Sequence, residues 1–196
     1  MTRTQYYVAA SIDGYIADAD GRLDWLFQFN DAQGVTEHYT KFLSGVGALA
    51  MGAATYEFIL AELREAWPYA GIPTWVFTHR ELPGYPGADI RFTTEDVGAV
   101  HEQMVRAAGE KNIWLMGGGN LVAQFSKRGL LDELLLGVAP VILGGGIPLL
   151  PARLPGPLEL QGITRFGQGM VELRYEIPRG AGGASGEPYP KSHNPG

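Results

Sequence analysis

The chain has 196 residues, 45% of them hydrophobic, 18% charged and 11% aromatic, which is typical of one globular domain and excludes a fibrous or disordered protein. The formal net charge of -6 and the lack of a basic run argue against nucleic-acid binding, so we expect a small-molecule partner. Because the chain has no cysteine, no metal-ligand spacing among its four histidines and no apolar run of about 18 residues, we expect no metal site, no membrane contact and a cytoplasmic protein.

Strand and helix patterns alternate along the first half of the chain. Continuous apolar runs predict buried strands over residues 6–12, 46–51 and 74–77. Apolar residues at helical spacing predict helices over residues 35–44 and 55–63. This alternation is typical of a mostly parallel sheet with helices packed on both of its faces.

The same alternation continues into the middle of the chain. Residues 90–92 predict a short strand that leads into another helix. Thr93 or Thr94 is expected to cap this helix at its N-terminus. Glu95 and Asp96 then lie in its first turn, where the helix dipole favours negative charge.

The next unit is marked at both ends of its helix. Residues 112–116 predict a strand that runs through three glycines into the helix. Lys127 and Arg128 in the last turn complement the helix dipole, and Gly129 is the expected left-handed residue after it. A further strand is expected over residues 134–139.

The C-terminal part predicts a hairpin and a tail. Residues 158–166 and 170–177 alternate in part around a glycine-containing turn, which predicts two antiparallel strands. We therefore expect an α/β fold, with a mostly parallel central sheet, helices on both faces and a C-terminal antiparallel hairpin, in one domain over residues 1–178. Residues 179–196 are rich in Gly and Pro and bury too little apolar surface to order, which predicts a flexible tail.

The glycines after residues 112–116 are the first sign of a binding site. Gly117, Gly118 and Gly119 would let a phosphate approach the backbone, and the free N–H groups at the start of a helix stabilise an anion. The alternative is a tight strand-to-helix turn without a ligand. The spacing differs from the Gly-x-Gly-x-x-Gly fingerprint, which disfavours a Rossmann domain.

Two more strand ends have groups suited to a nucleotide. Gly52 turns the chain after one strand, and Thr55 either caps the next helix or offers its hydroxyl to a phosphate. His79 and Arg80 follow another strand, where a cation either meets a ribose phosphate or is simply solvated. Because strand ends of an open parallel sheet share one edge, the three junctions together predict a crevice for a dinucleotide.

Four segments resemble a known family when they are taken together. They are AASIDGYIA at residues 9–17, MGAATYE at 51–57, MGGGNL at 116–121 and LDELLLGVAPVILGGG at 131–146. Their order and separations are similar to those of the C-terminal reductase domain of the bifunctional riboflavin-biosynthesis deaminase-reductase and its stand-alone bacterial relatives. These proteins are in turn similar to dihydrofolate reductase. The resemblance covers roughly residues 5–178.

The resemblance implies a dihydrofolate-reductase-like fold, NADPH as the coenzyme with NADH as the alternative, and a homodimer. It implies that backbone near Ala9 and Ile16 holds the nicotinamide carboxamide, and that Thr78 and Arg80 hold the adenosine ribose and its 2′-phosphate. Thr55 beside Gly52 matches a second phosphate contact. The residues that match the diphosphate turn are Gly117, Gly118, Gly119, Asn120 and Leu121.

The chain departs from the family pattern at residues expected near the coenzyme's 2′-phosphate and near the substrate. Many relatives carry arginine where Ala53 stands, which leaves Arg80 as the main cation. Trp25 is a candidate wall of the substrate site, and Asp24 is a candidate proton donor or substrate anchor, or else a helix cap or solvated acid. Asn30 stands where dihydrofolate reductase would have a carboxylate, which argues against dihydrofolate as the substrate.

These features predict an NADPH-dependent reductase that transfers hydride to a small substrate. The expected substrate is a pterin-like or riboflavin-precursor-like heterocycle, an imine or a carbonyl compound. The alternatives are a dinucleotide-binding protein without turnover, or a carrier of a flavin or another mononucleotide. We expect the hairpin over residues 158–177 to offer the sheet edge of the homodimer.

Overall fold

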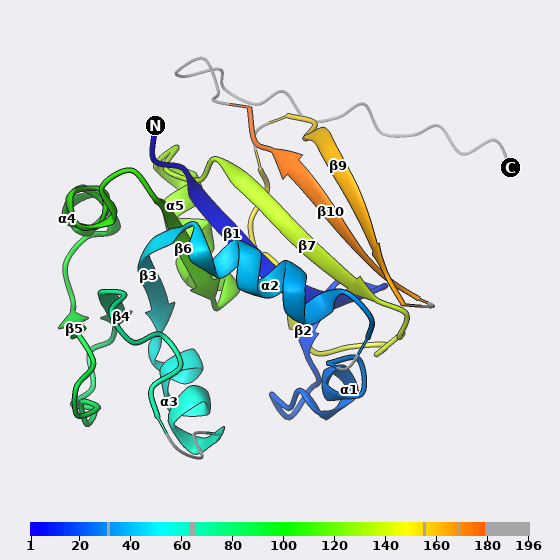
Figure 1. Cartoon of the computed structure of the whole chain (residues 1–196), viewed down its shortest axis with the longest axis horizontal. Helices are drawn as coiled ribbons and strands as arrows, with labels where there is room; N and C mark the ends of the chain where they lie inside the picture. Colours follow the sequence, from blue (N-terminus) through cyan, green and yellow to red (C-terminus); the bar gives the residue numbers. More distant parts are fainter. Residues whose placement is uncertain (31, 63–65, 155, 168, 179–196) are drawn as a thin grey trace, which may run out of the picture.

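A computed structural model describes residues 1–30, 32–62, 66–154, 156–167 and 169–178. Its main feature is an eight-stranded sheet with the strand order β5-β4-β3-β6-β1-β7-β10-β9 (Figure 1). The strands are β1 (Thr4–Ser11), β3 (Val46–Gly52), β4 (Thr74–Phe77), β5 (Ile90–Thr93), β6 (Asn112–Gly117), β7 (Glu133–Ala139), β9 (Glu159–Phe166) and β10 (Met170–Glu176).

The sheet is mostly parallel, as the alternation of strands and helices predicts. All neighbours from β5 to β7 pair in parallel, whereas β10 pairs antiparallel with both β7 and β9. A second small sheet joins β2 (Tyr15–Ala17) to β8 (Ile147–Pro148) in antiparallel pairing. The predicted α/β fold with its C-terminal antiparallel hairpin is confirmed.

Helices cover both faces of the sheet, because successive strand residues point to opposite sides. Tyr6 and Ile113 pack against α4 (Val97–Ala108) and α5 (Gly119–Lys127). On the other face Tyr7 and Trp114 pack against α2 (Val35–Ser44). Figure 1 shows α2 in front of the sheet and α5 behind it.

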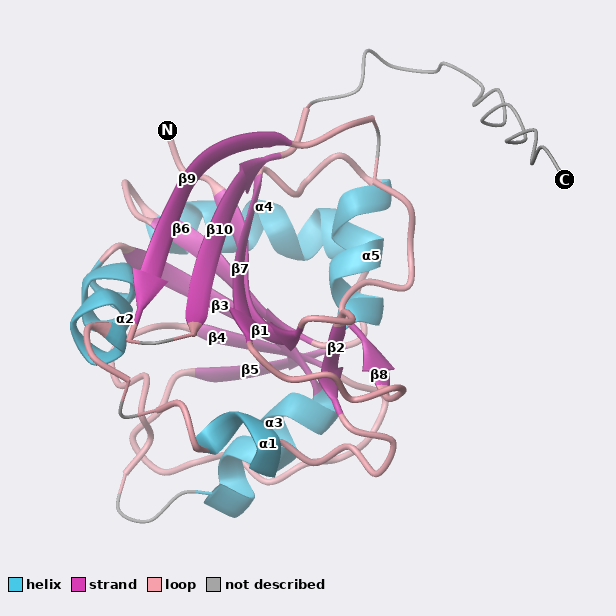
Figure 2. Ribbon diagram, turned by 90° about the vertical axis from the view of Figure 1, so that its right-hand side faces the viewer, coloured by secondary structure: helices cyan, strands magenta, loops and turns pink. Residues whose placement is uncertain are grey.

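Two further helices lie below the sheet in both views (Figures 1 and 2). They are α3 (Ala53–Glu62), which follows β3, and α1 (Asp24–Phe27), which follows the small sheet strand β2. The rings of Phe27 and Phe58 stack with centroids 6.5 Å apart and an interplanar angle of 22°. This contact joins α1 to α3 beside the carboxyl ends of the parallel strands.

Several local expectations are corrected by the structure. The cap of α4 is Asp96, whose carboxylate accepts a hydrogen bond of 2.8 Å from the amide of Gly98, so neither Thr93 nor Thr94 caps this helix. Thr93 ends β5 instead, and its hydroxyl accepts from the amide of Glu95. Gly129 has the expected left-handed conformation, with φ of +67°.

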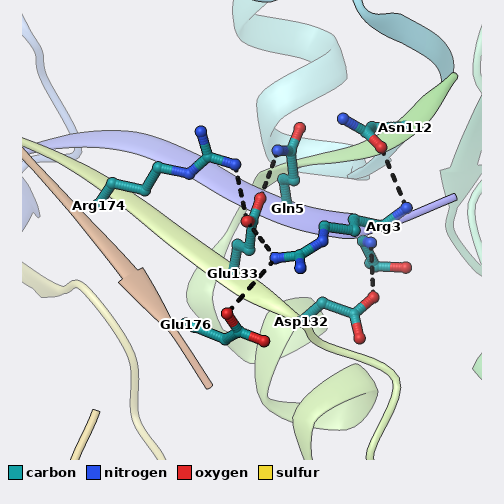
Figure 3. A network of polar contacts seen from close by, with 8 residues as sticks. Arg3, Gln5, Asn112, Asp132, Glu133, Arg174 and Glu176 are labelled. Carbon is teal, nitrogen blue, oxygen red and sulfur yellow. Dashed lines mark hydrogen bonds and ion pairs between the residues drawn. The ribbon is translucent and has the colours of Figure 1, made fainter. Parts of the chain in front are cut away.

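A buried carboxylate at the start of β7 ties the hairpin to the centre of the sheet, and Figure 3 shows its contacts. Glu133 is 1% exposed and accepts hydrogen bonds from Gln5 at 2.6 Å, Arg3 at 2.5 Å and Arg174 at 2.7 Å. These residues come from β7, β1, the segment before β1, and β10. Burial by itself raises the pKa of Glu133, but the Gln5 and Arg174 hydrogen bonds and the charges of Arg174 and Arg3 outweigh it and hold this pKa below its ordinary value.

Some expectations lie outside the described residues. These are the whole predicted tail at residues 179–196, the last residue of the helix predicted over residues 55–63, and residue 168 in the hairpin turn. The division into a domain and a tail therefore stays a prediction. Among the residues that are described, no helix combines the length and apolar character needed to cross a membrane.

Candidate functional site

The three predicted junctions meet at one edge of the sheet, although β4 leads through a loop to β5 and only β3 and β6 lead directly into helices. The register aligns Gly52 at the end of β3 with Phe77 at the end of β4, and Met51 with Gly117 at the end of β6. Adjacent strands are about 4.8 Å apart, so the ends of β4, β3, β6 and β1 together span about 14 Å. The edge is therefore wide enough to present several separate contacts to one extended ligand.

The turn between β6 and α5 has an open backbone. Gly117 has φ of +133°, a conformation that side chains rarely adopt, and the peptide bond from Gly117 to Gly118 is cis. A Cβ atom at Gly118 would have no neighbour within 4 Å, so the space beside this residue is empty. The amides of Gly119 and Asn120 donate to no acceptor among the described residues. The helix dipole adds to these free N–H groups, and together they suit an anion.

Two of the predicted turn residues have a structural task. A Cβ atom at Gly119 would lie 2.8 Å from the carbonyl oxygen of Leu149, so glycine is required there for close packing. The amide of Leu121 donates to the carbonyl of Gly118 at 3.0 Å, and the Leu121 side chain is buried in the core. The open part of the turn is therefore the backbone from Gly117 to Asn120.

Thr55 and Gly52 lie against this turn. Thr55 is the third residue of α3, and its hydroxyl makes no hydrogen bond within the described ranges, so it does not cap the helix. A Cβ atom at Gly117 would lie 3.8 Å from the Thr55 hydroxyl oxygen, and one at Gly52 would lie 3.9 Å from the amide nitrogen of Gly118. A free hydroxyl thus stands next to the free amides of α5.

Arg80 and Thr78 stand at the end of β4, where the sequence predicts a ribose site. The Thr78 hydroxyl accepts a hydrogen bond of 2.9 Å from the Arg80 amide, which fixes the turn. The Arg80 guanidinium donates to both carboxylate oxygens of Glu57 on α3, at 3.0 and 2.7 Å. No local sequence pattern indicates this ion pair, because its partners are 23 positions apart.

A gap opens between β1 and β6 at this same edge. The ladder between these strands ends at Tyr6 and Leu115, although β1 continues to Ser11 beside β7. Ile113 donates to the carbonyl of Arg3, so odd-numbered residues of β1 turn their polar backbone groups toward β6. The backbone N–H and C=O of Ala9 therefore face the gap with no partner on β6, so they are open to hydrogen bonds with an amide group of a ligand.

The segment that contains Ile16 is clamped to the loop after β7. The carboxylate of Asp13 accepts hydrogen bonds from the hydroxyl of Ser11 and from the amides of Leu143 and Gly144. The Ser11 hydrogen bond, followed by the two amide bonds, holds the pKa of Asp13 below its ordinary value. Sequence reasoning missed this role of Asp13, although Asp13 lies inside the first family segment.

The predicted substrate residues lie on the other side of β1. Asp24 is the first residue of α1 and is exposed, and its carboxylate accepts no hydrogen bond from the described residues. Trp25 packs with Ala139, Phe166 and Met170 below the end of β7. Its indole nitrogen is buried and has no partner in the part of the chain that the structure describes. Asp24 and Trp25 thus flank the far end of the same edge.

A separate cavity lies away from this edge. It has a volume of about 400 Å³ and is lined by residues 149–150, 152–154 and 156–158, together with Tyr6, Leu131 and Leu134. The hydroxyl of Tyr6 donates there to the carbonyl of Leu149. The cavity lies on the α5 side of the sheet, away from Ala9 and Thr55. Within the described ranges, no group of three or more histidine, aspartate or glutamate side chains could hold a metal ion.

Comparisons with known proteins agree with this geometry. The sequence pattern of the RibD C-terminal domain family matches residues 66–172. A Bacillus subtilis (strain 168) protein named "Uncharacterized protein YwjB" is 36% identical over 174 residues, which cover 88% of this chain and 97% of YwjB.

Solved structures of similar fold extend the comparison. A Shewanella sp. PV-4 protein named "Putative riboflavin biosynthesis protein" has a TM-score of 0.77 at 27% identity, over 91% of this chain and 100% of the other. A Thermotoga maritima diaminohydroxyphosphoribosylaminopyrimidine deaminase/5-amino-6-(5-phosphoribosylamino)uracil reductase has a TM-score of 0.62 at 16% identity, over 90% of this chain and 57% of the other. At that identity the second likeness shows the fold alone. The chain therefore belongs to the RibD C-terminal domain family, whose reductase domains have the dihydrofolate-reductase-like fold.

Proposed function

We propose that the protein is a cytoplasmic reductase that transfers hydride from a reduced nicotinamide dinucleotide to a small heterocyclic, imine or carbonyl substrate. NADPH is the coenzyme that the family resemblance implies, and NADH is the alternative. The coenzyme supplies the hydride when it is bound, while the protein contributes position and electrostatics.

One observation carries this proposal: unpartnered polar groups follow one another along the edge from β6 to β1. The amides of Gly119 and Asn120 with the Thr55 hydroxyl suit a diphosphate. The backbone of Ala9 in the gap beside β6 suits a carboxamide, which both donates and accepts hydrogen bonds. A dinucleotide that ends in nicotinamide has these groups in the same order.

The substrate end of the proposal rests on α1. Asp24 is our candidate proton donor or substrate anchor because its carboxylate is exposed and unbonded within the described residues beside the end of β1. The buried indole N–H of Trp25 is a candidate donor to a substrate acceptor. A hydrogen bond from this N–H to the substrate would satisfy a buried donor that has no partner within the described residues.

Turnover separates the reductase from a protein that only binds the coenzyme. We expect loss of absorbance at 340 nm when the protein and reduced coenzyme meet one of a panel of pterins, riboflavin-pathway pyrimidines, imines and simple carbonyl compounds. Asp24→Asn should lower kcat for the active substrate by at least about tenfold if the carboxylate transfers a proton. Coenzyme that binds but is never consumed across the panel would contradict the proposal.

We also propose that two chains pair through β9, the edge strand of the hairpin. Leu160 and Ile163 on this strand are 51% and 64% exposed, which is unusual for large apolar side chains on an unpaired edge. Light scattering at micromolar concentration should give twice the chain mass of 21.2 kDa. Ile163→Lys should give the single mass, whereas Val105→Lys on α4 should not. A monomeric wild type would contradict the pairing.

A further inference from the structure

We infer that Glu57 determines the coenzyme specificity of the site. Its carboxylate engages the guanidinium of Arg80 and so weakens binding of a dinucleotide with a 2′-phosphate, relative to one with a free 2′-hydroxyl. The inference rests on the proposed function, because it concerns the adenosine end of the same crevice.

The geometry of the pair leaves Arg80 little capacity for another anion. Two parallel hydrogen bonds of 3.0 and 2.7 Å join the guanidinium to the carboxylate of Glu57, which is the strong bidentate arrangement. Thr78 and the Arg80 amide fix the turn from which the guanidinium reaches α3. A phosphate must therefore displace Glu57, or approach the two together and face the carboxylate.

The surrounding charges do not replace the cation that Glu57 neutralises. Within residues 52–62 and 77–82, the acidic side chains are Glu57, Glu62 and Glu81. Arg80 and His79 are the basic side chains in these ranges, and Ala53 supplies no charge at the start of α3. A 2′-phosphate would thus enter a region without net positive charge, which is unfavourable for a group of charge near −2.

A free 2′-hydroxyl makes no such demand. A carboxylate has about four lone-pair sites, and the two bonds from Arg80 leave Glu57 able to accept a further hydrogen bond. The ribose hydroxyls of NADH can therefore bind with the ion pair intact. The side chains of Arg80 and Glu57 are 58% and 42% exposed, so solvent weakens the effect of their ion pair. We therefore expect Glu57 to change the ratio of the NADPH and NADH affinities several-fold, without excluding either coenzyme.

The test measures the dissociation constants of NADPH and NADH from the full chain, with coenzyme fluorescence as the readout. In the wild type we expect NADPH to bind no more than about tenfold more tightly than NADH. Glu57→Gln should tighten NADPH about fivefold and change NADH less than about twofold, because an exposed pair and its repulsion contribute on this scale.

Three further proteins make the result specific. Glu62→Gln removes the same charge from the same helix without releasing Arg80, which is paired with Glu57, and should change both affinities less than about twofold. Arg80→Gln should weaken NADPH more than NADH. Glu57→Gln made in the Arg80→Gln background should tighten NADPH less than it does alone, since no guanidinium is released. Thermal melts by circular dichroism check that each variant is folded.

Two failures are distinguishable. If both coenzymes bind but Glu57→Gln leaves their ratio unchanged, the inference about Glu57 is overturned and the proposed function stands. If neither coenzyme binds to the wild type or to any variant, the proposed function is overturned, and the inference with it.

Discussion

Gly118→Val is expected to abolish coenzyme binding while the protein stays folded. Gly118 has φ of −78° and ψ of 176°, an extended conformation that valine adopts readily. The space beside its Cα is empty, so the new side chain meets no protein atom within 4 Å at its Cβ and instead fills the volume next to the free amides of α5. Two charge-assisted hydrogen bonds to the diphosphate would be lost, which weakens binding by about 100-fold or more.

The experiment compares dissociation constants from coenzyme fluorescence with the unfolding temperature of each variant. Gly162→Val is the matched control, because Gly162 on β9 also has no neighbour within 4 Å of a Cβ, and it lies far along the sheet from β6. Coenzyme affinity should be unchanged in this control. A Gly118→Val protein that binds NADPH and NADH as the wild type does would show that the diphosphate lies elsewhere.

Glu133→Ala is expected to lower the free energy of unfolding by about 3 kcal/mol at pH 7. The substitution removes a carboxylate that is 1% exposed and leaves Gln5, also buried, and two arginines without their acceptor. Urea denaturation measures the loss. Glu102→Ala is the control, because the exposed pair of Glu102 with Arg106, 4.0 Å apart, should contribute less than about 0.5 kcal/mol.

The same carboxylate should make stability depend on pH. The pKa of Glu133 in the folded protein is lower than its unfolded value of about 4.3, so its ionised form stabilises the fold above that pH. This contribution is lost as the pH falls through the folded pKa. Glu133→Gln should therefore be less stable than the wild type at pH 7, and the difference should narrow by pH 3.5. A difference that stays constant over this range would rule out the charge as its source.

Much of the fold follows from local patterns. The strands β3 and β4 are short apolar runs, which place them to within one or two residues. Buried residues at helical spacing also predict α4, although its N-cap is Asp96 rather than Thr93 or Thr94. By contrast β2, β8 and α1 have three, two and four residues, which is too short for any period to stand out. Their positions depend on contacts between distant segments, such as the hydrogen bonds from the 143–144 amides to Asp13.

The candidate site divides in the same way. Glycines before a helix predict the turn at residues 117–120 because the chemistry and the local geometry are adjacent in sequence. The packing role of Gly119 depends on Leu149, and the ion pair of Glu57 depends on Arg80, so neither is visible in a local pattern. The opening beside Ala9 depends on where the β1–β6 ladder ends, which only the assembled sheet reveals.

Calorimetric titration of the wild-type protein with the oxidised and reduced forms of NADP and NAD tests the central claim most directly. The free amides beside Gly118 and the backbone of Ala9 predict saturable binding of at least one reduced form, with one coenzyme per chain. If none of the four forms gives a heat of binding to a chain that melts cooperatively, the assignment of this sheet edge to a nicotinamide dinucleotide would be contradicted.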